Sequence, residues 1–440
     1  MKIKLIEKTY NEVMALPKQE HKKPHRPDIF FRTLMRLVSI PDLKKTGFSF
    51  ERIGMEKLGK KEPALYLMNH SSFIDLEIVA TMLYPRPFNI VTTTDGFIGK
   101  NWLMRRIGCI PTKKFVNDLT LVHDMQYALH EKKSSVVLFP EAGYSFDGTA
   151  NPIPTSLGKC IKHLKVPVVM IKTFGAYHRD PLYNNLQVRK VKVSAKEEFL
   201  LSREEVESLS SDEINLKLQE AFSFDSFAWQ KENKIKVNEP FRADYLNRLL
   251  YKCPHCLKEG TMLGKGVEIK CSSCGKGYEL DEFGYLKSLD GDAKFEHIPD
   301  WYNWQRECVK REIEDGTYRS EFPVDICMTV DTKHLYHVGE GTFLHTGEGF
   351  RLVGCDGKLN YEQKPLASYT LNSDFNWYEI GDVVSVGNNK ALFYCFPKIA
   401  KDVVAKLRLA AEELFKKLSE ELHTIKDGCK IKERCDNNCE

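Results

Sequence analysis

The sequence has no long hydrophobic run, no internal repeat and no low-complexity segment. None of its apolar stretches approaches the ~20 residues that a membrane-spanning helix needs, and its start lacks the basic, apolar and small-residue succession of a signal peptide. Its net charge of +4 is too small to indicate nucleic-acid binding by itself. With 42% apolar and 29% charged residues, we expect a soluble globular protein of two or three domains rather than a disordered chain.

The 13 cysteines lack the even, regular spacing of a secreted disulfide framework. Two C-x2-C pairs stand apart from an odd remainder, which favours a reducing compartment and a metal site. Basic residues are concentrated at the start of the chain: Lys2, Lys4, Lys8, Lys18, Lys22, Lys23 and Arg26 stand against Glu7, Glu12 and Glu20. We therefore expect a cytoplasmic protein, and peripheral contact with the inner face of a membrane stays open.

Short β-rich runs alternate with helical patterns between residues 62 and 195. The runs are 64–68, 88–92, 135–139, 167–172 and 188–193. This alternation predicts an α/β domain with a mostly parallel sheet, in which ligands and chemistry lie at the carboxyl ends of the strands. The charged, helix-prone residues 196–250 predict a helical tail and linker.

The second half of the chain changes character twice. A cysteine-rich module is followed by a helical linker, then by many short strands and a final amphipathic helix, which together predict a small β-domain closed by a helix. Its outline is similar to a PH-like fold, on shape alone. The predicted segments are a basic amphipathic segment at 1–45, the α/β domain at 46–235, the cysteine module at 250–290 and the β-domain with its helix at 323–425.

A histidine and an aspartate mark the point where an apolar strand gives way to an apolar helix. In one regular helix, residues five apart lie about 140° from each other, so His70 and Asp75 meet only if His70 precedes the helix and Asp75 is in its first turn. The carboxylate would then fix the imidazole tautomer and leave the other ring nitrogen as a general base. Ser72-x-x-Asp75 also matches a helix capping box, which needs no chemistry and remains the alternative.

Three further blocks follow at predicted strand ends. They are Gly108-x-Ile110-Pro111 leading to Lys113 and Lys114, then Phe139-Pro140-Glu141 with Gly143, Tyr144 and Ser145, and then the strand Val-Pro-Val-Val-Met-Ile at 166–171. In this order and spacing, the blocks over roughly residues 46–195 resemble the glycerolipid acyltransferase family of the lysophosphatidic acid acyltransferase type. The family signature is N-H-x4-D, G-x-I-x-x-x-R, F-P-E-G-T-R-S and an apolar V-P-V/I-x-P-V-like strand. This chain departs from it with Lys114 in place of arginine and with Ala142, Gly143 and Tyr144 in place of Gly-Thr-Arg.

The resemblance implies an O-acyltransferase of phospholipid biosynthesis. It would move a fatty acyl group from acyl-CoA or acyl-carrier protein to the hydroxyl of a lysolipid, above all 1-acyl-sn-glycerol 3-phosphate, with His70 as base and Asp75 as its partner. The implied acceptor-binding residues are Lys113, Lys114, Glu141, Gly143, Tyr144 and Ser145. Lysine pairs with phosphate without the bidentate fork of arginine. Alternatively, Glu141 bonds backbone amides at a strand end, and the two lysines form a solvated pair.

The cysteine module has the pattern C-x2-C-x14-C-x2-C, formed by Cys253, Cys256, Cys271 and Cys274. Each pair can place two thiolates on one tetrahedral metal, and the intervening length suits a short hairpin. The pattern predicts a zinc ribbon whose zinc is structural, because four thiolates leave no open coordination position.

Zinc ribbons often bind nucleic acid, which gives the alternative function. The chain would then be a catalytically degenerate regulatory protein that binds lipid or nucleic acid through the ribbon and the C-terminal domain. The ribbon has no excess of basic residues, so nucleic acid is the less favoured partner.

Residues 26–41 have the composition of a helix that lies on a membrane surface. Apolar Ile29, Phe30, Phe31, Leu34, Leu37 and Val38 are interspersed with Arg26, Arg32 and Arg36. At helical spacing, such a segment can lie in the interface with its basic residues toward anionic headgroups. The alternative is a helix packed on the α/β domain.

Overall fold

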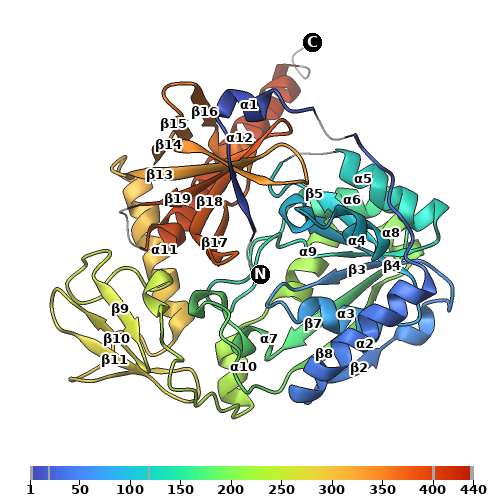
Figure 1. Cartoon of the computed structure of the whole chain (residues 1–440), viewed down its shortest axis with the longest axis horizontal. Helices are drawn as coiled ribbons and strands as arrows, with labels where there is room; N and C mark the ends of the chain where they lie inside the picture. The colour runs from blue at the N-terminus through green and yellow to red at the C-terminus, as the bar shows by residue number, and fades with distance from the viewer. Residues whose placement is uncertain (1–2, 18–19, 117–118, 399–401, 437–440) are drawn as a thin grey trace.

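Three β-sheets organise the protein in a computed structural model that describes residues 3–17, 20–116, 119–398 and 402–436. Figure 1 shows them as separate lobes, with the cysteine module and the C-terminal sheet placed beside the α/β region. Within the described residues, no helix combines the length and the apolarity required to cross a bilayer.

The α/β region contains a seven-stranded sheet of order β2-β8-β7-β3-β6-β4-β5. Its strands are β2 Ser49–Ile53, β3 Leu65–Met68, β4 Phe88–Thr93, β5 Cys109–Thr112, β6 Ser135–Leu138, β7 Val168–Phe174 and β8 Ser194–Leu201. Neighbouring strands are parallel except β7 and β8, which are antiparallel, so the expected α/β fold is present with a mixed sheet.

Helices cover both faces of this sheet. They are α2 Ile29–Lys45, α3 Asp75–Met82, α4 Asn101–Arg106, α5 Leu119–Gln126, α6 Ser156–Leu164, α7 Ala176–Arg179, α8 Arg203–Ser208, α9 Ser211–Phe222 and α10 Ser226–Glu232. Strand β3 shows how the two layers form, because successive side chains of a strand point to opposite faces. Tyr66 and Met68 pack with α2 and α3, whereas Leu65 and Leu67 pack with α5, α6 and α9. The central strand is therefore apolar throughout.

The last strand of this sheet is not where the sequence predicts it. Residues 188–193 are not a strand, and the charged residues 194–201 form β8, between β2 and β7. The backbone of β8 is hydrogen-bonded to a neighbouring strand on each side. Glu197 of this strand is buried, and its carboxylate pairs with the Arg52 guanidinium at 2.7 Å. The prediction of helix from residue 196 is therefore wrong up to α8.

The cysteine module forms a four-stranded antiparallel sheet of order β12-β11-β10-β9. Its strands are β9 Met262–Lys265, β10 Glu268–Cys271, β11 Gly277–Leu280 and β12 Leu286–Ser288. The module packs on α11 Ile298–Glu314, where the buried Trp301 ring lies 5.1 Å from the Tyr278 ring. The Trp301 indole N–H donates to the carbonyl of Lys252 at 3.0 Å, which fixes the helix against the module.

The C-terminal sheet has eight strands and includes the first described strand of the chain. Its order is β16-β15-β14-β13-β19-β18-β17, with β1 paired to β14. The strands are β1 Leu5–Glu7, β13 Arg319–Thr329, β14 Leu335–Thr346, β15 Gly349–Gly354, β16 Leu359–Gln363, β17 Asn372–Trp377, β18 Gly381–Gly387 and β19 Leu392–Pro397. Because β15 pairs only with residues 341–346 of β14, the start of β14 is left as an open edge that β1 covers in parallel.

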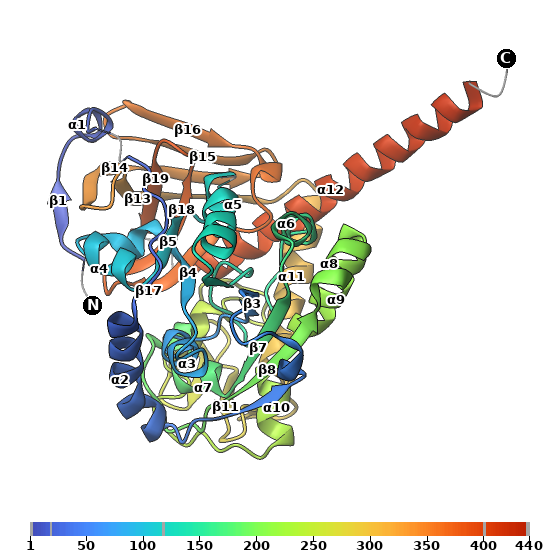
Figure 2. The same ribbon diagram turned by 90° about the vertical axis from the view of Figure 1, so that its right-hand side faces the viewer.

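Two helices complete this region, α1 Tyr10–Met14 and α12 Val403–Asp436. The first turns of α12 are buried against the sheet and α11, and its later turns extend away from the body (Figure 2). The expected β-domain with a terminal helix is present. Its similarity to a PH-like fold, like the exact segment boundaries, stays a prediction.

Candidate active site

The sequence blocks meet because their strands are neighbours. Strand β3 pairs in parallel with β6 on one side and β7 on the other, so the residues that follow all three strands lie at one edge of the sheet. Asn69 ties two of these strand ends together. Its side-chain oxygen accepts from the Thr173 amide at 2.8 Å, and its nitrogen donates to the Ser71 hydroxyl at 3.0 Å.

His70 and Asp75 form the pair that their spacing allows. His70 lies in the loop after β3, Asp75 is the first residue of α3, and His70 Nδ1 is 2.9 Å from Asp75 Oδ2. A carboxylate only accepts hydrogen bonds, so Nδ1 carries the proton and Nε2 presents a lone pair. The same Oδ2 accepts from the backbone amides of Ser71 and Ser72 at 2.9 and 3.2 Å. Asp75 thus orients the imidazole and also satisfies amides at the start of the helix.

Two aromatic rings enclose the imidazole of His70. The centroid of the Phe139 ring lies 4.3 Å and that of the Tyr144 ring 4.1 Å from the centroid of the imidazole, with the ring planes inclined to it by 33° and 31°. The burial lowers the pKa of His70, the hydrogen bond and charge of Asp75 raise it, and the Lys114 ammonium lowers it. With 20% of its side chain exposed, His70 is a neutral imidazole that a substrate can still reach.

The Glu141 carboxylate accepts hydrogen bonds from backbone amides at the end of a strand, as the structural alternative for this residue predicts. Its buried carboxylate accepts from the His70 amide and from the Asn151 amide, each at 2.7 Å. Burial raises the pKa of Glu141 to about 7, a net value that includes the opposing effect of the two amide hydrogen bonds. The Ser145 hydroxyl donates to the Thr149 carbonyl at 2.7 Å. Both side chains therefore shape the loop after β6, and a direct substrate contact by either stays a prediction.

The two predicted lysines lie where the α/β region meets the C-terminal sheet. The Lys113 ammonium donates to the Asn389 carbonyl. Lys114 lines a cavity together with polar residues of the C-terminal domain, Gln363, Ser368, Thr370, Asn372 and Ser385. Burial raises the pKa of Asp374 to about 7, a net value that includes the opposing effect of the Lys114 ammonium. The Lys114 ammonium thus acts electrostatically on both His70 and Asp374 of β17.

Contacts from the C-terminal domain were not predicted from the sequence. The Tyr369 hydroxyl donates to the Pro140 carbonyl at 3.2 Å, and Phe375 packs on Phe146 with ring centroids 4.6 Å apart. Arg408 of α12 donates to the Tyr144 carbonyl at 3.3 Å across 264 positions of sequence. Nothing distinguishes Arg408 from the other basic residues of an amphipathic helix, so the sequence held no signal for it.

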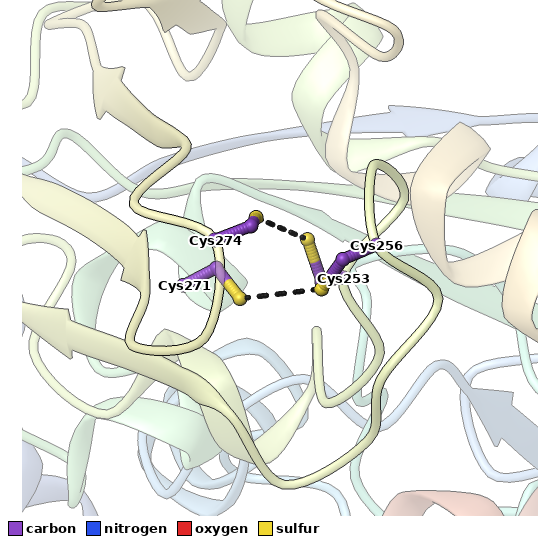
Figure 3. Close-up of side chains that lie close together, drawn as sticks. All are labelled: Cys253, Cys256, Cys271 and Cys274. Atoms are coloured by element: carbon purple, nitrogen blue, oxygen red, sulfur yellow. Dashed lines mark hydrogen bonds between the residues drawn. The ribbon is translucent and has the colours of Figure 1, made fainter.

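The four cysteines of the module converge on one point (Figure 3). Cys253 and Cys274 Sγ are 3.7 Å apart, as are Cys256 and Cys271 Sγ, and all four sulfur atoms lie within 4.8 Å of one another. A tetrahedral zinc with Zn–S of ~2.3 Å would separate its sulfur ligands by about 3.8 Å. The cluster can therefore hold one metal ion of that kind.

Gly275 closes the second knuckle of the cluster. Its φ of +80° is a conformation that glycine adopts without strain, and its amide donates to the Cys271 carbonyl at 2.9 Å.

Part of the α/β region is similar to known acyltransferases. Residues 49–172 match the family model Acyltransferase. A curated relative, the 1-acyl-sn-glycerol-3-phosphate acyltransferase BAT2, chloroplastic, of Brassica napus, is 26% identical over 151 residues, which cover 33% of this chain and 42% of the relative. The chain thus spans less than half the length of that relative.

Among solved structures, the 1-acyl-sn-glycerophosphate (LPA) acyltransferase PlsC of Thermotoga maritima aligns with a TM-score of 0.36 and 16% identity, over 43% of this chain and 76% of that one. The segment matched by the family model carries His70 and Asp75, whereas the cysteine cluster and the C-terminal domain lie outside it. The family model and the curated relative confirm the resemblance to acyltransferases of this kind, over residues 49–172 for the family model.

Proposed function

We propose that the chain is an O-acyltransferase that acylates a lysolipid. His70 Nε2 takes the proton of the acceptor hydroxyl, and that oxygen attacks the thioester carbonyl of acyl-CoA or acyl-carrier protein. The new C–O bond forms, the C–S bond breaks, and the thiol leaves with the proton returned by His70. The observation that carries the proposal is the His70–Asp75 pair at 2.9 Å, which leaves Nε2 for the substrate, within the segment that matches the family.

The proposed acceptor is 1-acyl-sn-glycerol 3-phosphate, with its phosphate on Lys114. The electrostatic effect of Lys114 on His70 and its place in a cavity lined by polar side chains support this assignment. Tyr144, which stands where the family has arginine, adds no positive charge, because a phenol is neutral at physiological pH, and burial raises its pKa further. One lysine then provides the electrostatic attraction for the phosphate, with no bidentate partner.

The four cysteines are proposed to hold a structural zinc in a zinc ribbon. Their near-tetrahedral sulfur spacing supports this assignment. The acyl transfer step needs no group from this metal. Its contribution is to stabilise the fold of the module that packs on α11.

We also propose peripheral attachment to the inner, cytoplasmic face of a membrane through α2. This helix packs on α3 and buries only Ser39 and Leu43. Phe30 and Val38 are each 68% exposed, and Trp102 beside α2 is 66% exposed. Exposed apolar side chains next to arginines suit the boundary between acyl chains and anionic headgroups.

The experiment that tests the function measures thiol release from acyl-CoA and from acyl-carrier protein against a panel of lysolipids. Lipid products are identified by mass. We expect release that depends on the lysolipid, and a Lys114→Ala variant with a higher KM for a phosphate-bearing acceptor and an unchanged KM for the donor. No release with any pair, together with binding of RNA or DNA at low salt, would instead support the regulatory alternative.

A further inference from the structure

Arg408 is a buried arginine of the C-terminal helix whose donors reach into the acyltransferase region. Its Nη2 donates to Asn151 Oδ1 at 2.7 Å, its Nη1 donates to the Tyr144 carbonyl at 3.3 Å, and its Nε donates to Glu412 Oε1 at 3.2 Å. The guanidinium also lies 4.2 Å above the Phe146 ring. Each of the three guanidinium nitrogens therefore has an acceptor, and two of these acceptors belong to the loop after β6.

The contact with Asn151 continues to the backbone of His70. Asn151 donates its own amide to Glu141 Oε1 at 2.7 Å and its side-chain nitrogen to the Gly143 carbonyl at 3.0 Å. The other oxygen of Glu141 accepts from the His70 amide at 2.7 Å. Four residues thus form one hydrogen-bonded path, Arg408 to Asn151 to Glu141 to His70, and its middle members are buried or half-buried.

We propose that Arg408 is a positioning residue of the acyltransferase site. It holds the loop of residues 139–151 so that the Tyr144 ring stays against the imidazole and the Glu141 carboxylate stays on the His70 amide. The C-terminal domain is then part of the active centre, although it lies outside the segment that matches the family. This inference rests on the proposed acyl transfer and concerns a residue that does not touch the reacting atoms.

The need for arginine follows from geometry. A planar guanidinium with several fixed N–H directions can serve Tyr144, Asn151 and Glu412 at once, whereas the single ammonium of lysine cannot. Arg306 provides a matched control in the same buried cluster. It pairs with the same Glu412 at 2.8 Å and with Glu413 at 2.9 Å, and among the described residues it forms no hydrogen bond or ion pair with the loop.

The test compares Arg408→Lys with Arg306→Lys in the full chain, with zinc content and unfolding midpoint measured for both. We expect Arg408→Lys to lower kcat by roughly 10- to 100-fold, the scale of a small misplacement of catalytic groups. Because burial lowers the pKa of His70, loosening a loop that covers the imidazole should move that pKa up toward 6.5. Arg306→Lys should lower the unfolding midpoint and leave kcat per folded molecule and the pKa of His70 unchanged.

NMR titration of the His70 imidazole gives a result that needs no turnover. If wild-type protein transfers no acyl group, the proposed function fails, and the titration still decides whether Arg408 positions His70. Asn151→Ala interrupts the same path and keeps the Glu412 pair, so it replaces Arg408→Lys if that variant does not fold. An unmoved pKa of His70 in both Arg408→Lys and Asn151→Ala, or equal losses of kcat in Arg408→Lys and Arg306→Lys, would overturn the proposal.

Discussion

The cysteine cluster and the His70 site are both recognisable from short motifs, but they are assembled differently. The outermost ligands of the cluster, Cys253 and Cys274, are 21 positions apart, and the four lie in the loop before β9, at the end of β10 and in the turn that follows it. The His70 site draws its supporting contacts from the ends of β3, β6 and β7 and from α12. A sequence motif can therefore predict all the residues of a site whose residues are close in sequence. For a site built between domains, it predicts only the residues that carry the chemistry.

The largest expected effect concerns the local site. Purified protein should contain about one zinc per chain, and Cys271→Ser should lose it, because three thiolates no longer close the tetrahedron. Structural zinc contributes ~10–16 kcal/mol to the folding of small zinc domains, so the unfolding midpoint should also fall markedly. Elemental analysis and thermal unfolding measure the two effects. Wild-type protein that is fully folded without metal would contradict the assignment.

The second effect removes the chemical centre of the other site. Loss of a general base typically costs ~10²–10⁴-fold in rate, so His70→Ala should nearly abolish thiol release and leave zinc content and unfolding unchanged. His163→Ala, at an exposed position of α6, is the surface control. Full turnover by His70→Ala would leave only the capping role of Asp75.

A smaller effect tests the orientation of the imidazole. Asp75→Asn should lower kcat by roughly 10²–10³-fold, because the correct tautomer is no longer held. The activity needs neutral His70, so it is lost as the pH falls through the pKa of His70, below the ordinary value of 6.5. Asp75 raises that pKa, and its loss should therefore move the acid limb of kcat/KM to still lower pH. A limb that stays in place would show that Asp75 does not interact with the catalytic imidazole.

The smallest expected effect lies outside both sites. Phe30→Glu or Val38→Glu should reduce sedimentation with vesicles that contain acidic lipid by several-fold, and turnover on dispersed substrate should be unchanged. Salt should weaken the binding of wild-type protein, since part of it is electrostatic. Leu216→Glu, at an equally exposed site on α9, is the matched control. Equal loss of binding in that variant would refute the assignment to α2.

The same contrast explains what the sequence could predict of the fold. The apolar runs before His70 and Glu141 predict β3 and β6 well, because central parallel strands are apolar on both faces. Strand β8 was missed because its buried Glu197 is satisfied by Arg52, a partner that only the folded chain provides. Arg408 was missed for the same reason. Its hydrogen-bond acceptors in the loop after β6 are brought to it by packing, and no local sequence pattern predicts them.

The pairing of β1 with β14 also affects the order in which parts of the chain can fold during synthesis. Glu7 and His337, whose side chains are hydrogen-bonded at this junction, are 330 positions apart. At a synthesis rate of ~5–20 residues per second, the first strand leaves the ribosome roughly 15–70 s before its partner exists. The α/β domain can fold in that interval with β1 still unpaired. The C-terminal sheet can close, and Arg408 can reach the catalytic loop, only after β14 and α12 have been synthesised, so nascent chains should not acquire activity before that point.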